Sequence, residues 1–200
     1  MKQTTRTILI LTTTILFTIA VALVAQHFLG KAGCQKIDLD AIRNLSDEEI
    51  SIEVADILDL RYGFLEDEQM ALSAMSETEQ TVKTLAEFDL EYTDGGLAQY
   101  FTNPSRDTAP YLIESLRTIN APNMANAIEE YVATQKIDME DPLEFHYDSQ
   151  KLLEWELELY GVDAINNKLY SLIEQEHFHK KMIAYIRYNL EELVYGEDNE

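Results

Sequence analysis

Pairs and runs of carboxylates are the side chains of this sequence with the most evident chemistry. Glu87 and Glu91, and likewise Glu154 and Glu158, stand four positions apart, which places each pair on one helix face roughly 6 Å apart. Other carboxylates form a denser run: Asp138, Glu140, Asp141 and Glu144. Any one of these groups is most simply a solvated surface residue. Collectively they produce an electronegative field, so the chemistry that we expect is the binding of cationic side chains.

Catalytic and metal-binding patterns are weak by comparison. His177 and His179 stand two positions apart, so on a helix they point to nearly opposite sides and should not chelate one ion. The run from Asp138 to Glu144 lacks the glycine and the spacing of a calcium-binding loop. Gly95-Gly96 is followed by neither a GxxG nor a Lys-Ser/Thr pattern, which disfavours a phosphate-binding loop. We therefore expect no enzyme, no metal and no cofactor.

The charge balance supports an interaction with a basic partner. The chain has 15 Lys and Arg against 37 Asp and Glu, a net charge of −22, and its first acidic residue is Asp38. Such a field repels nucleic acid and anionic lipid and attracts basic proteins. Direct nucleic-acid binding is not expected, and the single cysteine, Cys34, excludes an intrachain disulfide framework.

The amino-terminal stretch has the composition of a membrane anchor. Residues Thr7 to Leu29 contain no Asp, Glu, Lys or Arg, and as a helix they would span roughly 30 Å, the thickness of a hydrocarbon core. The alternative is a cleaved signal peptide, because Ala20-Val21-Ala22 matches a small-x-small cleavage site. We prefer a transmembrane anchor over residues 1–30, since apolar residues continue beyond Ala22.

The orientation of this anchor is nearly balanced by charge. Lys2 and Arg6 flank one side, whereas Lys31, Lys36 and Arg43 flank the other. We expect a single-pass inner-membrane protein with an extracytoplasmic domain, because a short charged amino-terminal tail usually stays inside. The alternatives are a cytoplasm-facing domain and a protein secreted after cleavage.

The rest of the chain predicts an all-α fold. A short linker, residues 31–40, leads into one compact multi-helix domain, residues 41–200. Capping-box patterns stand at Ser46–Glu49 and Ser76–Glu79, before apolar residues at helical spacing. Further stripes of this spacing continue to Leu193, and no strand alternation competes with them.

Residues 91–122 predict a corner between helices. Gly95 is expected to take a left-handed conformation that closes a helix ending near Tyr92, and Gly96 to let the next short helix approach closely. Asn103 should end that short helix, because a residue before proline, here Pro104, avoids helical angles. Pro122 should begin a later helix in its first turn.

The segment from Ser76 to Val132 resembles the carboxyl-terminal domain of the acidic DNA-mimic protein family. In that family an acidic helix leads to Asn-Gly-Gly-Phe, an aromatic pair, Asn-x-Ser, Ala-Pro and Gly-Ala-Pro. The corresponding residues here are Asp94-Gly95-Gly96-Leu97, Tyr100-Phe101, Asn103-Pro104-Ser105, Ala109-Pro110 and Asn120-Ala121-Pro122. The sequence thus has Asp94, Leu97 and Asn120 where the family has Asn, Phe and Gly.

The resemblance implies an all-helical domain, often a homodimer, that binds a transcription regulator in place of DNA. It supplies no catalytic residues. As partner-binding residues we predict the carboxylates of the pairs and runs together with Asp94. The alternative is an envelope-located immunity or inhibitor protein that neutralises a basic toxin or secreted enzyme. Both hypotheses require that carboxylates from separate segments gather on one face.

Overall fold

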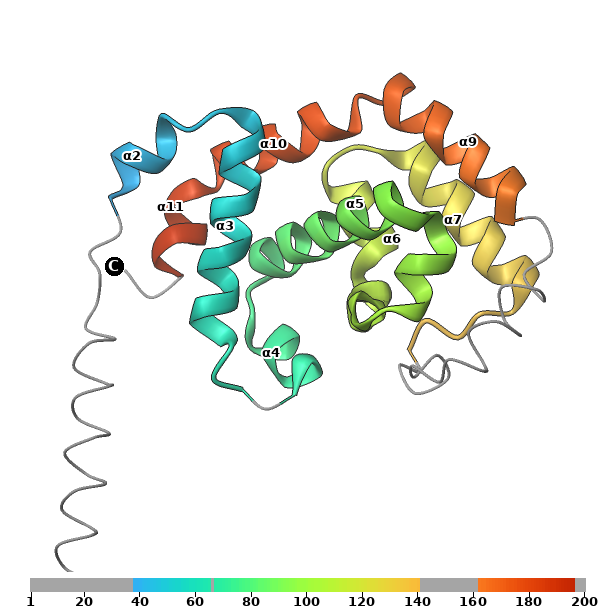
Figure 1. Ribbon diagram of the computed structural model, residues 1–200, viewed down its shortest axis with the longest axis horizontal. Coiled ribbons are helices and arrows are strands. Elements are labelled where there is room, and N and C mark those ends of the chain that lie inside the picture. Colours follow the sequence, from blue (N-terminus) through green and yellow to red (C-terminus); the bar gives the residue numbers. More distant parts are fainter. Residues whose placement is uncertain (1–37, 66, 141–161, 197–200) are drawn as a thin grey trace, which may run out of the picture. The chain divides into compact units, whose positions relative to one another are not determined.

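The computed structural model describes residues 38–65, 67–140 and 162–196, and its regular structure there is entirely helical (Figure 1). The chain divides into one unit from Met1 to Asp38 and a second from Leu39 to Glu200; the helices named below belong to the second. The prediction of an all-α domain is therefore confirmed. Within the described ranges, no helix has the length and apolar character of a membrane span. The anchor predicted over residues 1–30 lies outside them.

The helices follow one another with short connections. Their bounds are α2 Leu39–Arg43, α3 Asp47–Tyr62, α4 Glu68–Ala74, α5 Glu77–Thr102, the 3-10 helix η1 Pro104–Thr108, α6 Ala109–Thr118, α7 Pro122–Gln135, α9 Val162–Gln175, α10 Phe178–Tyr188 and α11 Leu190–Tyr195.

Both predicted capping boxes are present. The Ser46 hydroxyl accepts the Glu49 N–H at 3.3 Å, and the Glu49 carboxylate accepts the Ser46 N–H at 3.0 Å. Ser76 and Glu79 repeat the arrangement at 3.2 and 2.9 Å. These bonds satisfy amide donors that a helix start leaves unpaired, so the first residues of α3 and α5 are set locally.

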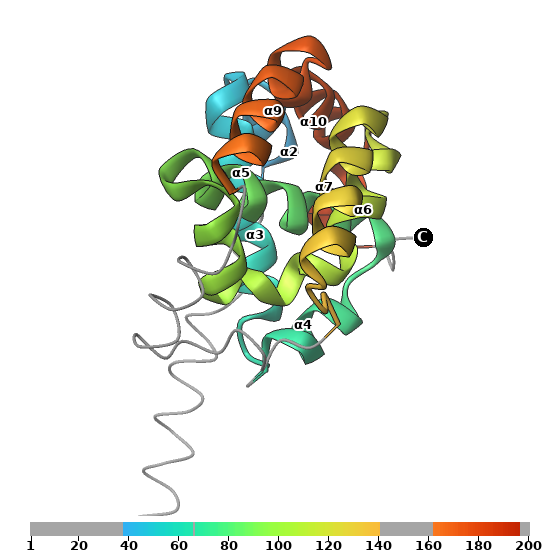
Figure 2. The ribbon, with the colours of Figure 1, turned by 90° about the vertical axis from the view of Figure 1, so that its right-hand side faces the viewer.

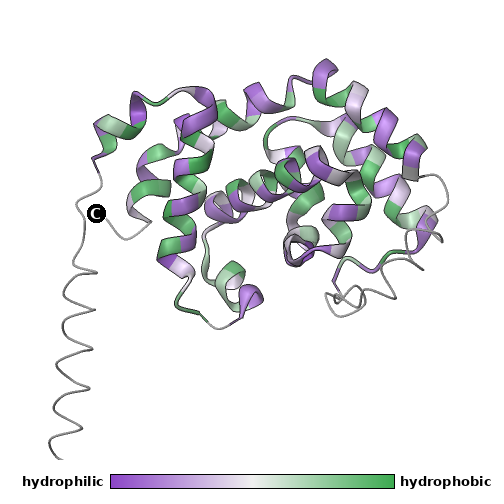
Figure 3. Cartoon of the chain, viewed as in Figure 1, coloured by the Kyte–Doolittle hydropathy of each residue, from purple (hydrophilic) through white to green (hydrophobic). Residues whose placement is uncertain are grey.

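The core is built around α5, which runs through the middle of the domain and contacts α3, α6, α9 and η1 (Figure 1). Phe88 of α5 meets Tyr100 and Phe178 edge to face, with ring centroids 5.5 and 6.1 Å apart. Figure 2 shows α7 between α6 and α9, in agreement with their contacts. Each of these helices carries both polar and apolar residues (Figure 3), as expected for amphipathic helices around one core.

The prediction for Gly95 is wrong. The left-handed conformation belongs to Gly96, with φ +73° and ψ −165°, and the helical turns of α5 continue through Gly95 to that point. The break comes one residue later than expected because α9 reaches the chain there. A Cβ on Gly96 would lie 2.5 Å from the Asn166 side chain, so the close approach at Gly96 is that of α9.

The other turn residues act as predicted. Asn103 is extended, with ψ 168°, and ends α5, while Pro104 opens η1. Pro122 lies in the first turn of α7. Asn120, which replaces the glycine of the resembling family, has φ +62°. Asparagine is among the few residues that tolerate this conformation, so the replacement preserves the turn.

Candidate binding surface at the glycine corner

A hollow of about 270 Å³ lies where the kink of α5 faces α9. Its lining includes Tyr92, Thr93, Asp94, Asn166, Asn167 and Tyr170. The side chains of Thr93, Asp94, Asn167 and Tyr170 are exposed at its rim. The hollow thus combines one carboxylate, amide and hydroxyl groups and an accessible aromatic ring.

Asn166 fixes the geometry of this hollow. Its Oδ1 accepts the Leu97 N–H at 3.1 Å, and its backbone carbonyl accepts the Tyr92 hydroxyl at 2.6 Å. In a continuous helix the Leu97 N–H would donate to the Thr93 carbonyl. Burial, together with the neighbouring Tyr170, raises the pKa of Tyr92 to about 12. The hydroxyl therefore remains a donor at neutral pH.

Glu91 holds the two sides of the corner together. Its carboxylate accepts hydrogen bonds from Gln99 Nε2 at 2.7 Å and Asn103 Nδ2 at 2.6 Å. The side chain is half-buried. Glu91 was predicted to bind a partner; these contacts assign its carboxylate a role in the fold, and a role in binding stays a prediction.

The Glu87 carboxylate also forms an ion pair within the domain. Its carboxylate lies 2.7 Å from the buried Lys83 ammonium, which also contacts Asp59 at 2.6 Å. Burial raises the pKa of Glu87, and the attraction of Lys83 opposes this shift without cancelling it. The Glu87–Glu91 pair is therefore not a solvated pair of negative charges.

The other predicted carboxylates differ in accessibility. Asp94 is exposed at the rim of the hollow, and Asp138 and Glu140 are exposed beyond α7, where Asp138 Oδ1 accepts the Glu140 N–H at 3.0 Å. The remaining four lie outside the described residues: Asp141, Glu144, Glu154 and Glu158. A role for these residues in partner binding stays a prediction.

Most cations of the described residues are engaged by the domain itself. They contact a carboxylate or a backbone carbonyl of the same chain: Arg43, Arg61, Lys83, Arg106, Arg117, Lys168, Lys181 and Arg187. In contrast, Glu53, Asp56 and Asp94 are exposed and have no ion-pair partner among the described residues. Asp94 was among the residues predicted from the sequence, whereas Glu53 and Asp56 were not, because ion pairs between distant segments form only on folding.

Glu176 is a buried carboxylate that the sequence patterns did not single out. It accepts the backbone N–H groups of Asn123 and Met124, at 3.2 and 2.8 Å, and the Asn123 side-chain amide at 3.1 Å. The position before α7 is Ala121, which offers no side-chain cap. Glu176 therefore replaces the missing local cap with a charged acceptor from the end of α9.

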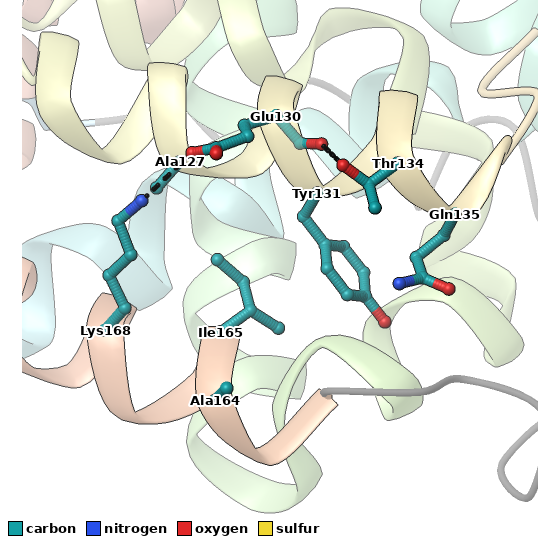
Figure 4. A pocket seen from close by; sticks show the side chains of 8 residues that line it. All are labelled: Ala127, Glu130, Tyr131, Thr134, Gln135, Ala164, Ile165 and Lys168. Carbon is teal, nitrogen blue, oxygen red and sulfur yellow. Dashed lines mark hydrogen bonds and ion pairs between the residues drawn. The ribbon is translucent and has the colours of Figure 1, made fainter.

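A second hollow, of about 260 Å³, lies between α7 and α9 (Figure 4). The Tyr131 side chain projects from α7 into it, and its buried hydroxyl has no hydrogen-bond partner among the described residues. Burial raises the pKa of Tyr131 to about 12. An ion pair between Lys168 and Glu130, at 3.2 Å, crosses between the same helices.

The part of the chain that contains the glycine corner matches a known protein family. Neither the curated proteins nor the solved structures contain a match to the chain. Among protein families, the DMP19-like proteins match residues 73–189. This range includes the glycine corner, Asn166 and Glu176, and it covers more than half of the sequence. The chain is thus a member of the DMP19-like protein family, the DNA-mimic family that the motifs around the corner indicated.

Proposed function

We propose that the folded domain is a non-enzymatic, acidic binding module that occupies the basic DNA-binding surface of another protein. The observation that carries this proposal is that, in the described part of the chain, most cations are paired within the domain, whereas several exposed carboxylates are not. Most cations of the described residues contact the domain's own carboxylates and carbonyls, whereas Glu53, Asp56 and Asp94 are exposed and have no ion-pair partner among those residues.

This distribution has a direct electrostatic consequence. A cation held in an internal ion pair neutralises its own partner and does not screen carboxylates elsewhere. The net charge of the chain is −22, so the carboxylates that are not paired produce a negative electrostatic field in the surrounding solvent. An outward field of this sign speeds association with basic surfaces and disfavours direct binding to nucleic acid. Membership of the DMP19-like family supports the same class of partner.

The test is competition with DNA. The full-length protein, purified in neutral detergent, is immobilised and used to capture proteins, and each captured basic protein is then challenged with duplex DNA to which it binds. We expect displacement by DNA and an affinity that falls steeply with salt. Binding that is indifferent to both would overturn the proposal. A variant that combines Glu53→Gln, Asp56→Asn and Asp94→Asn should bind more weakly while its thermal unfolding is unchanged.

The predicted anchor favours a second candidate, an envelope protein that neutralises a basic toxin or secreted enzyme. The apolar stretch from Thr7 to Leu29 motivates it, since an extracytoplasmic domain could not meet a cytoplasmic regulator. Proteolysis of intact spheroplasts separates the two candidates. Cleavage of the domain in intact spheroplasts supports the envelope role, and protection until the membrane is broken supports the regulator role.

A further inference from the structure

We propose that the hollow at the glycine corner receives one arginine side chain of the basic partner. The inference rests on the proposed binding function and adds to it a specific site and a preferred residue type. At about 270 Å³ the hollow is smaller than most sites for drug-sized ligands, which enclose roughly 300–1,000 Å³. Its size is therefore better suited to a single side chain than to a cofactor.

The acceptors at the rim suit a guanidinium group. Asp94 is exposed and has no ion-pair partner among the described residues. Asn167 of the facing helix α9 lines the same hollow and is exposed, so its side-chain carbonyl offers a second acceptor. Arginine presents five donors in a planar fork, so it can bond a carboxylate and a carbonyl at the same time.

The kink adds a further electrostatic preference. The first part of α5 effectively ends at Gly96, where helical angles stop. The carboxyl end of a helix carries a partial negative charge and favours cations. Asp94 lies in that last turn, so its charge adds to the negative end of the helix. A bound cation would relieve the repulsion between the two.

Tyr170 supplies the feature that distinguishes arginine from lysine. Its side chain is 72% exposed, and it lines the hollow together with Asp94. Asn167 stands three positions earlier, on the same side of α9, and offers an amide oxygen. A guanidinium can stack on the ring while it bonds the rim acceptors, whereas the compact lysine ammonium cannot form both sets of contacts with the same geometry.

The neighbouring cations of the domain do not compete for this site. Lys168 follows Asn167 but is bonded to Glu130 of α7 at 3.2 Å. His179 is bonded to Asp89, one turn before Asp94 on α5, at 2.9 Å. Both groups are thus paired with other carboxylates.

The experiment compares two probes, fluorescent nona-arginine and nona-lysine, by anisotropy with the full-length protein in neutral detergent. We expect both peptides to bind in a salt-dependent manner and nona-arginine to bind more tightly. Asp94→Asn and Tyr170→Leu should each weaken nona-arginine binding by about two- to fivefold. They should affect nona-lysine binding less, so that the preference for arginine is reduced.

Two matched controls make the outcome decisive. Glu77→Gln removes one exposed charge from the first turn of α5, and Tyr188→Leu removes an 89% exposed ring from α10. If the controls lower nona-arginine binding as much as the corner variants do, the site assignment is wrong although the binding function stands. If the unmodified protein binds neither peptide, the proposed function itself fails. Unchanged circular dichroism and melting temperature would show that each variant is folded.

Discussion

Asn166 Oδ1 accepts the Leu97 N–H at 3.1 Å, although the two residues are 69 positions apart. The side chain of α9 thus binds a backbone donor of α5 directly after the kink at Gly96. This bond therefore stabilises the kink of α5 and at the same time holds α9 against it. The corner and the hollow depend on the same contact.

Substitution of the glycine at the kink should destabilise the fold. Gly96→Ala places a Cβ in the left-handed region and 2.5 Å from the Asn166 amide. We expect a loss of about 1–3 kcal/mol in the free energy of unfolding, measured by urea titration. The same substitution in an Asn166→Ala background is the control, since it removes the side chain that the new Cβ would meet and leaves the positive φ of Gly96 in place. An equal loss in the two backgrounds would show that the close approach of Asn166 does not contribute to the requirement for glycine.

Removal of the buried acceptor at α7 should be costly. Glu176→Ala leaves the Met124 N–H, a buried donor, without its partner. We expect a loss of about 1–3 kcal/mol by chemical unfolding. Glu174→Ala, an exposed carboxylate of the same helix, should change stability by no more than about 0.5 kcal/mol. Similar values for the two variants would contradict the capping role.

Lys83 should be more sensitive to substitution than a lysine in an exposed ion pair. Its ammonium lies between Asp59 and Glu87, and the pKa of Lys83 is raised because their attraction outweighs the effect of burial. Lys83→Met leaves half-buried negative charge without its partner, so we expect a loss of about 3–5 kcal/mol. Lys168→Met breaks an exposed ion pair with Glu130 and should cost less than about 1 kcal/mol. Denaturant titrations of both variants test this ranking, and equal losses would contradict it.

The His179–Asp89 contact should make stability depend on pH. The hydrogen bond that His179 Nε2 donates to the Asp89 carboxylate raises the pKa of His179 above its ordinary 6.5, while partial burial opposes the shift. Because the folded pKa is raised, the stabilisation is complete at pH values below 6.5 and is lost as the pH rises through the folded pKa. The His179 side chain is more than half exposed, so the effect should be below about 1 kcal/mol.

The measurement for His179 is a double comparison. Unfolding free energies at about pH 5.5 and about pH 8.5, on either side of the ordinary histidine pKa, are determined for the unmodified chain and for His179→Gln. The drop toward high pH should be smaller in the variant, and the other titrating groups cancel in the difference. An identical drop in both proteins would show that the contact with Asp89 has no energetic consequence.

Tyr131 should tolerate loss of its hydroxyl. The buried oxygen has no partner among the described residues, so Tyr131→Phe should be neutral or stabilising by up to about 1 kcal/mol. Tyr100→Phe is the control, since the buried Tyr100 hydroxyl lies 2.8 Å from the Thr108 hydroxyl. That variant should lose about 1 kcal/mol or more. Thermal unfolding distinguishes the two, and a marked loss in Tyr131→Phe would indicate an unrecognised hydrogen bond in the second hollow.

The sequence by itself determined the elements that depend on local chemistry. The capping boxes at Ser46 and Ser76 and the prolines at 104 and 122 mark helix boundaries that the structure confirms. These devices act within one turn, so their residue types and spacing are sufficient. The motifs of the corner also identified the family, because turns constrain residue type strongly.

Only the tertiary structure decided which glycine takes the positive φ and which carboxylates form contacts within the domain. Gly96 rather than Gly95 takes the positive φ, at the point where Asn166 of α9 binds the chain. Glu91 forms hydrogen bonds within the domain because the kink places Gln99 and Asn103 next to its carboxylate. The number of carboxylates follows from the sequence, but their availability does not. The Lys83–Asp59 and Lys168–Glu130 ion pairs and the Glu176 cap of α7 join segments far apart in the chain, and each depends on direct contact between its partners. Those contacts form only when the helices pack.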